Sequence, residues 1–349
     1  MVYIIILVWN GKKYLSKLFE SLGVLSYPKE KYKILVLDSA SSDGSLEFLE
    51  RLEKEGKIEL MKLQKNLGFC GGNNIGMKYA LNNGAKHIVL LNQDTFVEPD
   101  FLSELIKTAE SEEKIGAVQA LLLYNDGKTI NSLGNQNHIL GYGWCEGNYQ
   151  QLTTYNLQLT TPKKITYASG AAVLYKAELL KKIGLFDENY FSYNEDADVC
   201  WRARLAGYKT VLAPNSVVYH DYHFPTDKNK KRYFWMEKNR LYMVWKFYRL
   251  KTLLFLSPLF LAMCVGQLVN AVRKGYTKEF FGARLWFIPN FFKVRKTRRE
   301  VQKTRQISDR ELMKDFASEI KYQPVNNFLL DKIGNPMMRV YWKLIKKII

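Results

Sequence analysis

The feature that most constrains the fold is an alternation of two kinds of segment in the first 125 residues. Short runs rich in β-branched residues alternate with amphipathic stretches of ten or more residues. The pattern predicts strands at 3–8, 33–37, 58–63, 87–91 and 115–123, and helices at 12–22, 45–54, 72–82 and 100–110. Strand and helix in alternation predict an α/β fold, with a mostly parallel sheet and helices on both of its faces.

The pattern continues less regularly after residue 125. Residues 125–167 are rich in Asn, Gln, Gly, Thr and Tyr, and we interpret them as an irregular insertion able to line a binding cleft. A strand at 168–175, a helix from Lys176, a helix at 196–206 and a strand pair at 210–213 and 217–219 are expected to follow. Because ligands bind at the carboxyl ends of strands in such sheets, the loops after Val8, Leu37, Leu63 and Leu91 are the first places to search.

Two of these loops suit a nucleotide or sugar. Asp38 ends a predicted strand and can accept hydrogen bonds from a base or ribose, whereas Asp43-Gly44-Ser45 is also typical of an ordinary turn and helix cap. The glycine-rich link at 66–76 lets backbone N–H groups approach a phosphate closely, but close helix–sheet packing explains the same glycines. It is neither a GxGxxG fingerprint nor a P-loop.

Oxygen ligands follow the strand at 87–91. Asn92 and Asp94 alternate onto one side and offer an amide and a carboxylate to a hard cation, although a solvated loop start has the same composition. His220 ends a predicted strand. A lone histidine is more often a hydrogen-bonded structural residue than a ligand, so His220 matters for metal binding only if it lies near Asp94.

Three carboxylates crowd the start of one predicted helix. Glu195, Asp196 and Asp198 repel one another and need a helix dipole, a cation or a metal as compensation. Asp198 and Arg202 lie one turn apart and are expected to pair. Asp196 points out of the helix end, where it can take a proton from a hydroxyl nucleophile. A capped surface helix is the alternative interpretation.

Taken in order, these motifs resemble the inverting glycosyltransferases of family 2, which have the GT-A fold, and most closely the rhamnosyltransferase-like branch. The resemblance covers residues 1 to about 225 and is carried by 8–11, 36–45, 66–76, 90–94, 170–172 and 193–202, with Gly207. It implies a Rossmann-like sheet with flanking helices and transfer of a sugar from a nucleoside-diphosphate donor.

The resemblance also implies roles for individual residues. Nucleotide-binding positions are Val8, Asn10, Asp38, Asp43, Gly68 and Asn73. A divalent cation, Mg²⁺ or Mn²⁺, would be held by Asp94 with Asn92 and His220. Asp196 would be the general base, supported by Glu195, Asp198 and Arg202. The family's Asp-x-Asp is Asn92-Gln93-Asp94 here, which leaves strict metal dependence open.

The net charge of +18 is confined to the last third of the chain. Residues 1–229 hold 25 basic and 26 acidic side chains, whereas residues 230–349 hold 27 and 8. This asymmetry excludes a protein that is basic on every face, and we expect no nucleic-acid partner. Four widely spaced cysteines without a CxxC pair fit a reducing, cytosolic setting, and the apolar start is expected to be a buried strand and not a signal peptide.

The basic third also contains a run of 21 uncharged residues at 252–272, about 32 Å long as a helix. Positive charge after this run disfavours a single crossing, and a second apolar stretch at 280–292 favours monotopic or re-entrant attachment to anionic lipid at the cytoplasmic face of the membrane. The alternative is a soluble helical subdomain. We therefore expect a GT-A domain at 1–227 and a basic, apolar, helical membrane-associating region at 228–349.

Together these features predict a peripheral membrane enzyme. It would transfer a sugar, rhamnose by the branch resembled, from a dTDP- or UDP-linked donor to a polyprenyl-linked or polysaccharide acceptor in cell-envelope glycan synthesis. The alternative is a non-catalytic protein that binds polyanions or a membrane surface. A nucleotidyltransferase is disfavoured because Val8-Trp9-Asn10-Gly11 lacks the basic, glycine-rich loop of such enzymes.

Overall fold

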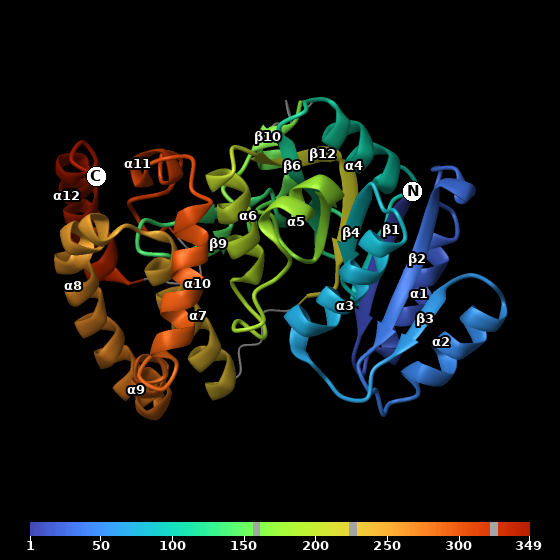
Figure 1. The fold of residues 1–349 in the computed structure, drawn as a ribbon, viewed down its shortest axis with the longest axis horizontal. Helices are drawn as coiled ribbons and strands as arrows, with labels where there is room; N and C mark the ends of the chain where they lie inside the picture. The colour runs from blue at the N-terminus through green and yellow to red at the C-terminus, as the bar shows by residue number, and fades with distance from the viewer. Residues whose placement is uncertain (156–160, 223–228, 322–326) are drawn as a thin grey trace. The chain divides into compact units, whose positions relative to one another are not determined.

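A computed structural model describes residues 1–155, 161–222, 229–321 and 327–349, which divide into two compact units (Figure 1). Unit 1 comprises residues 1–135, 145–204 and 208–223, and unit 2 comprises 136–144, 205–207 and 224–349. The expected domain boundary at residue 227 lies outside the described residues. The expected α/β fold with a C-terminal helical region is confirmed.

Unit 1 is built on a ten-stranded sheet in the order β10-β12-β6-β11-β4-β1-β2-β3, with β5 on β12 and β7 on β6. Its strands are β1 (Val2–Val8), β2 (Tyr32–Asp38), β3 (Glu59–Lys62), β4 (His87–Leu91), β5 (Thr95–Val97), β6 (Ile115–Leu123), β7 (Ile130–Ser132), β10 (Lys163–Lys164), β11 (Ala172–Lys176) and β12 (Lys209–His220). Neighbours β3-β2-β1-β4 are all parallel, whereas β11 runs antiparallel to β4 and β6. A short pair, β8 (Asn135–Asn137) with β9 (Gly143–Cys145), lies outside this sheet.

Alternation along β1 explains how helices cover both faces of the sheet. Ile4 and Ile6 share a buried cluster with Leu15 and Leu18 of α1 and Leu105 of α4. On the other face, α3 lies so close that a Cβ at its Gly76 would come 2.8 Å from both Ile5 and Leu37. The helices are α1 (Lys12–Leu22), α2 (Ser45–Lys54), α3 (Gly68–Asn82), α4 (Phe101–Glu110), α5 (Ala177–Ile183) and α6 (Glu195–Leu205), with 3₁₀ turns at Lys29–Lys31 and Leu152–Tyr155.

Two expected elements differ in extent from those observed. The strand pair at 210–213 and 217–219 is one strand, β12, whose register shifts between Ala213 and Val217. Pro214 lies in this irregularity, because a residue without an N–H cannot continue a ladder. Helix α3 begins at Gly68 and not at Gly72, so most of the glycine-rich link lies within the helix. The insertion at 125–167 contains β7–β10 among its described residues.

Unit 2 is helical throughout its longer elements. These are α7 (Lys230–Phe247), α8 (Leu250–Lys274), α9 (Thr277–Leu285), α10 (Phe291–Lys303), α11 (Asp309–Leu312), the π-helical turn Leu330–Gly334 and α12 (Asn335–Ile345). Helix α7 packs against α9 and α10. Several charged side chains of α7 are buried, including Glu237 and Arg240, which pair with each other.

Candidate functional site

Three loops meet at the carboxyl ends of β1, β2 and β4. Gln93, which follows β4, exchanges two hydrogen bonds with the backbone of Trp9: its Oε1 accepts from the Trp9 N–H at 2.9 Å, and its Nε2 donates to the Trp9 carbonyl at 3.2 Å. A Cβ at Gly11 would collide with the Gln93 carboxamide. Gly11 is therefore required for the contact that joins the loop after β1 to the Asn92–Asp94 segment.

The loop after β1 is also tied to the loop after β2. The Asn10 N–H donates to Ser41 Oγ at 3.0 Å, and the Ser42 N–H donates to Asn10 Oδ1 at 2.8 Å. Asn10 and Ala40 both have a positive φ, at 49° and 59°. Left-handed backbone is unfavourable for alanine, so the surrounding contacts hold these loops in one strained arrangement.

Val8 and Asp43, which were also expected to bind nucleotide, form hydrogen bonds with backbone groups of these loops. The carbonyl of Val8 accepts from the Ser39 N–H at 2.8 Å. Asp43 accepts from the Lys12 N–H and from Ser45, both N–H and hydroxyl, and these bonds lower its pKa although burial opposes them. Asp43 thus ties the loop after β1 to the start of α2, whose N-cap residue is Gly44.

Asp38 keeps an unused acceptor in these loops, and the hydroxyl of the neighbouring Ser39 is likewise buried without a hydrogen-bond partner. The Asp38 Oδ2 accepts from the Ser41 N–H at 3.1 Å, whereas its Oδ1 is buried and has no hydrogen-bond partner. Asp38 is 2 % exposed. Leaving a buried carboxylate oxygen unpaired costs about 1–3 kcal/mol or more, so the oxygen is suited to a donor on a bound ligand.

Asp94 and His220 are brought together, as metal binding requires. The Asp94 Oδ1 lies 3.4 Å from His220 Nε2, and this imidazole nitrogen is buried without a hydrogen-bond partner. On the other side of the ring, Nδ1 lies 3.2 Å from Asn131 Oδ1. Because an amide oxygen only accepts, the Nδ1 proton points to Asn131 and the lone pair of Nε2 points towards Asp94.

This pair fits a divalent cation. Burial raises the pKa of Asp94, but a protonated His220 would donate to this carboxylate and attract it, and with that contribution the pKa is lowered overall. Within the described residues, no group of three or more His, Cys, Asp or Glu side chains has metal-binding geometry. Two protein ligands suit Mg²⁺ or Mn²⁺ that takes further oxygens from a bound diphosphate. Asn92, the third expected ligand, makes a hydrogen bond with its backbone: its N–H donates to the Ala171 carbonyl.

Gly68 and Asn73 make packing contacts. Gly68 has a φ of +72° and lies against Phe191, where a Cβ would come 2.6 Å from the ring. Asn73 is buried within α3 and donates to the Phe69 carbonyl at 2.9 Å. Asn74, which the sequence analysis did not single out, exchanges hydrogen bonds with the Phe186 backbone. The glycine-rich segment therefore holds the loop that precedes α6.

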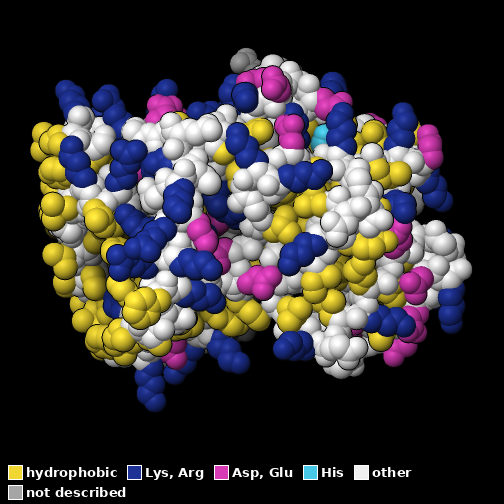
Figure 2. Space-filling view, in the orientation of Figure 1, with side chains coloured by type: hydrophobic (Ala, Val, Ile, Leu, Met, Phe, Trp, Pro, Cys, Tyr) yellow, Lys and Arg dark blue, Asp and Glu magenta, His cyan; other side chains and the backbone are white. Residues whose placement is uncertain are grey.

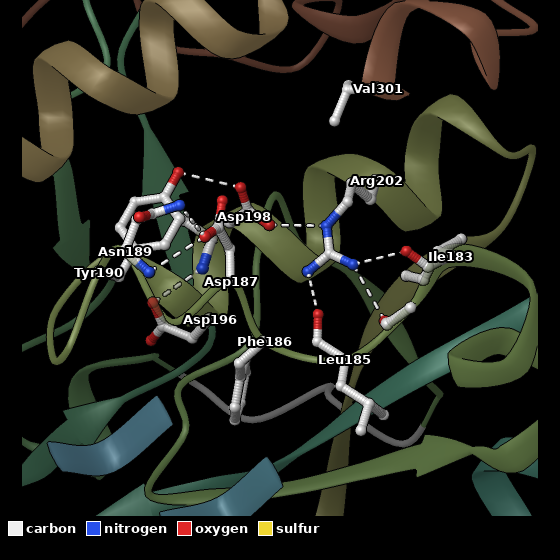
Figure 3. A network of polar contacts seen from close by, with 12 residues as sticks. Ile183, Leu185, Phe186, Asp187, Asn189, Tyr190, Asp196, Asp198, Arg202 and Val301 are labelled. Carbon is white, nitrogen blue, oxygen red and sulfur yellow. Dashed lines mark hydrogen bonds and ion pairs between the residues drawn. The ribbon is translucent and has the colours of Figure 1, made fainter. Parts of the chain in front are cut away.

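Asp198 and Arg202 form the expected pair and fix the same loop (Figure 3). Arg202 Nε donates to Asp198 Oδ1 at 2.6 Å, and its two terminal nitrogens donate to the carbonyls of Ile183, Gly184 and Leu185. Asp198 Oδ2 accepts from the Tyr190 hydroxyl at 2.9 Å. Because every guanidinium nitrogen is used in this way, Arg202 positions α6 relative to the loop before it.

Asp196 and Glu195 are carboxylates at the start of α6, and no Lys or Arg side chain among the described residues forms an ion pair with either of them. Burial raises the pKa of Asp196 to about 6, and burial together with the charge of Asp196 raises the pKa of Glu195 well above its usual value. Asp196 accepts from the N–H groups of Ala197 at 2.8 Å and Gly170 at 3.4 Å. At neutral pH Asp196, with its pKa of about 6, is an ionised carboxylate able to accept a proton.

Asp196 and the Asn92–Asp94 segment are joined through the two residues just before β11. Gly170 donates to Asp196, and the next residue, Ala171, accepts from the Asn92 N–H at 2.9 Å. The loop before α6 is strained as well, because Phe191, Tyr193 and Asn194 all have positive φ. Strain of this kind persists only where surrounding contacts enforce it, and it is concentrated here beside Asp196.

The sequence shows similarity to known proteins over its first half. The family model described as "Glycosyl transferase family 2" matches residues 3–184. A poly-beta-1,6-N-acetyl-D-glucosamine synthase of Staphylococcus aureus strain COL is 25% identical over 193 residues, which are 55% of this chain and 43% of that protein. A dolichyl N-acetyl-alpha-D-glucosaminyl phosphate 3-beta-D-2,3-diacetamido-2,3-dideoxy-beta-D-glucuronosyltransferase of Methanococcus voltae is 30% identical over 118 residues, 32% of this chain and 35% of that one. The chain thus spans less than half the length of these relatives.

Solved structures share the fold at low sequence identity. GalNAc-T7 with UDP, GalNAc and Mn²⁺ aligns with a TM-score of 0.58 and 15% identity over 85% of this chain and 57% of its own. The mannosyltransferase PcManGT from Pyrobaculum calidifontis, in complex with GDP-Man and Mn²⁺, aligns with a TM-score of 0.51 and 15% identity over 87% and 85%. At these identities the alignments support the architecture of the sheet and its helices.

Proposed function

The chain belongs to glycosyl transferase family 2, and from that premise we propose that it transfers a sugar from a nucleoside-diphosphate donor to an acceptor hydroxyl with inversion at the anomeric carbon. The observation that carries the proposal is Asp196, a partly buried carboxylate with a pKa near 6. A base with such a pKa is ionised at neutral pH and is still basic enough to take a proton in the transition state.

The other residues of the site have separate roles in this proposal. The unpaired Oδ1 of Asp38 accepts a hydrogen bond from the nucleoside, in the cradle formed by the loops after β1 and β2. Asp198 and Arg202 hold the start of α6 so that Asp196 keeps its place beside Gly170. Glu195 lies beside Asp196 at the start of α6, where burial and the charge of Asp196 raise the pKa of Glu195.

Asp94 and His220 are the proposed cation ligands, with Asn131 fixing the tautomer of the histidine. When bound, Mg²⁺ or Mn²⁺ neutralises negative charge that develops on the departing diphosphate. Unit 1 has few spare positive charges for this purpose, because residues 1–229 are close to neutral. Two solved proteins of similar fold are described with Mn²⁺, which supports the proposal.

The acceptor and cellular place are also proposed. We propose a polyprenyl-linked or polysaccharide acceptor in cell-envelope glycan synthesis, reached by an enzyme attached at the cytoplasmic face of the membrane. The similarity to the Staphylococcus aureus synthase supports a polysaccharide product, and the basic, apolar character of residues 230–349 supports attachment. Rhamnose on a dTDP or UDP carrier is the proposed donor, and UDP-GlcNAc is the first competitor to test, because a TarS structure in complex with it aligns with a TM-score of 0.51.

A donor screen on the full chain tests the proposal. We expect one nucleotide sugar from a panel of dTDP-, UDP- and GDP-linked donors to release its nucleoside diphosphate when Mn²⁺ and a polyprenyl-linked glycan acceptor are supplied. The anomeric configuration of the product, read by NMR, is expected to be opposite to that of the donor.

Two results would contradict the proposal. Retention of configuration would exclude direct attack by an acceptor hydroxyl that Asp196 deprotonates. Absence of turnover with every donor, together with tight and salt-sensitive binding of polyanions, would favour a non-catalytic binding protein instead.

A further inference from the structure

Helix α8 of unit 2 exposes an apolar stripe along its whole length. The exposed side chains are Leu250, Leu254, Leu261, Val265, Val269 and Val272. Their spacing of three, four and seven residues places them on one face of a helix with 3.6 residues per turn. Among the described residues, α8 is the helix whose length and mean hydropathy of 2.0 would allow it to cross a membrane.

The opposite face of α8 is packed against protein. Leu256, Leu259 and Ala271 are buried there. Gln267 lies on this inner face and donates from Nε2 to Glu237 Oε2 of α7 at 2.9 Å. It also lies 3.4 Å, through its Oε1, from a terminal nitrogen of Arg284 of α9. The inner face is therefore joined to two neighbouring helices by polar contacts.

Those contacts belong to a charged network within unit 2. Glu237 pairs with Arg240 at 2.8 Å and with Arg284 at 3.0 Å, and Arg240 also donates to the Leu140 carbonyl. Glu237 and Arg240 are 5 % and 6 % exposed. Removing one partner from such a network would leave a buried charge uncompensated and would strongly destabilise the fold. The network therefore holds α8 against α7 and α9.

This network is incompatible with α8 crossing a bilayer on its own. Gln267 lies five residues inside the end of the uncharged run at 252–272, which is about 8 Å along a helix axis. A spanning α8 would either break the contacts of Gln267 or carry Glu237 and two arginines into hydrocarbon. Each charge at that depth costs at least about 2.5–3.5 kcal/mol near the bilayer centre.

Two further elements extend the apolar stripe. The α9–α10 segment exposes Phe281, Leu285, Ile288, Phe291 and Phe292, α12 exposes Met337, Val340 and Leu344, and Ile348 is exposed just after α12. The Tyr341 hydroxyl of α12 donates to the Phe255 carbonyl of α8 at 2.7 Å, which joins these helices. Figure 2 shows hydrophobic side chains gathered over α8 and α9 with Lys and Arg among them. We call these nine side chains, together with the six of α8, the lipid-facing surface.

Basic residues border this surface at each element. Exposed examples are Lys251, Arg273 and Lys274 on α8, Lys293, Arg295 and Lys296 on α10, and Arg339, Lys343, Lys346 and Lys347 on and after α12. An apolar face with a basic rim complements an anionic membrane surface, where apolar side chains enter the acyl boundary and Lys or Arg contact the headgroups.

We infer that the lipid-facing surface docks onto an anionic bilayer with α8 lying in the plane of the membrane, so that both ends of α8 stay on one side. The inference deepens the attachment proposed above and does not depend on catalysis. According to this inference, three separate elements, α8, α9–α10 and α12, contact the same membrane surface.

Vesicle flotation of the full chain without donor or acceptor tests the surface. Leu261→Glu, Phe292→Glu and Leu344→Glu place a charge on each element in turn, at side chains 68 %, 81 % and 66 % exposed. Each is expected to weaken binding to vesicles of phosphatidylglycerol and phosphatidylcholine about tenfold. The matched control Val24→Glu, at a side chain of unit 1 that is 63 % exposed, is expected to leave binding unchanged. Equal loss in the control, or loss in the α8 variant alone, would overturn the three-element surface.

A labelling experiment tests the orientation of α8. Lys251→Cys and Lys274→Cys place thiols at the two ends of the helix, and the parent chain measures the background from its own four cysteines. With vesicle-bound protein, a membrane-impermeant maleimide is expected to label both sites equally before and after detergent. A site that reacts only after detergent would show that α8 crosses the bilayer and would overturn the in-plane arrangement.

The same variants distinguish a bilayer from a second copy of the chain. If the surface were a dimer interface, Leu261→Glu would change the molar mass measured by light scattering and leave vesicle binding intact, which would contradict the inference. If donor turnover were absent while the flotation pattern held, the proposed function would fail and the membrane inference would stand.

Discussion

At the scale of single residues, the orientation and tautomer of the His220 ring depend on one neighbour, Asn131. Asn131 lies in the insertion, and its Oδ1 accepts from His220 Nδ1 at 3.2 Å, which turns the Nε2 lone pair towards Asp94. From its composition we interpreted this insertion only as polar and irregular, and no sequence motif links residue 131 to residue 220. Gln93 was missed for a related reason, since alternation along a strand drew attention to Asn92 and Asp94 on either side of it.

Replacing Asn131 by alanine is expected to weaken metal activation. Without the acceptor at Nδ1, the His220 ring loses its orientation and its fixed tautomer, and loss of such a partner typically costs about 10–100-fold in metal affinity. The measurement is the Mn²⁺ concentration that gives half-maximal turnover. His87→Gln changes a buried histidine of β4 that faces Glu110, and it is expected to leave that concentration unchanged. An unaltered Mn²⁺ requirement in Asn131→Ala would remove His220 from the proposed ligands.

The raised pKa of Asp196 predicts the acid limb of the pH profile. Burial raises its pKa to about 6, so the carboxylate is protonated below that pH and cannot accept the hydroxyl proton. We expect kcat/KM to fall about tenfold for each pH unit below 6 and to level off above it. A profile that stays flat from roughly pH 5 to 7 would contradict this assignment.

At the scale of elements, close contact between α3 and the sheet explains the glycines of the 66–76 segment. A Cβ at Gly76 would lie 2.8 Å from Ile5 and Leu37, and one at Gly72 would lie 2.5 Å from Leu7. The sequence left phosphate binding and close packing as open alternatives, and the observed contacts are those of packing. The signal is ambiguous in a sequence because both uses need a residue without a side chain.

Gly76→Ala is therefore expected to destabilise the fold. Overpacking against two fully buried side chains costs about 1–3 kcal/mol, measured as a loss in the free energy of unfolding by denaturant titration with a fluorescence probe in unit 1. Gly266→Ala is the matched control, because nothing lies within 4 Å of a Cβ at that helical position in α8. Equal stability of the Gly76→Ala variant and the unmodified chain would show that α3 can move away from the sheet without cost.

The elements of unit 1 were more predictable than their connections. Four predicted helices and five predicted strands of the first 125 residues occur within a few residues of their expected positions, because buried strands and amphipathic helices carry strong periodicity. Helix α3 began earlier than expected, since glycine carries no periodic signal. The paired strands at 210–213 and 217–219 merged into β12 because pairing with β6 resumes beyond Pro214.

At the scale of the whole molecule, the uneven charge separates two tasks. Residues 1–229 are close to neutral and hold the candidate site, whereas residues 230–349 carry a large positive excess next to exposed apolar helices. The amount of charge was readable from the sequence. The sequence did not show which apolar side chains face outwards, because the packing of the helices depends on the buried network of Glu237, Arg240 and Arg284, which joins positions up to 47 residues apart.

Salt is expected to weaken attachment without abolishing it. Raising NaCl from about 0.1 M to 1 M shortens the screening length from about 10 Å to 3 Å, so the attraction of the basic rim to anionic lipid falls while apolar insertion persists. Flotation with phosphatidylglycerol vesicles should show reduced binding at high salt, and phosphatidylcholine vesicles should show weak binding that salt does not reduce. Complete release at high salt would mean that the apolar surface does not enter the membrane.

The central claim is that Asp196 is the base for sugar transfer, and Asp196→Asn tests it most directly. Because burial opposes the ionised form of Asp196, the amide is expected to fold at least as well as the native carboxyl. We predict a loss in kcat of about 10²–10⁴-fold with donor affinity unchanged by isothermal titration, and unchanged kcat in the control Glu113→Gln at an exposed turn. Full turnover by Asp196→Asn would contradict the account.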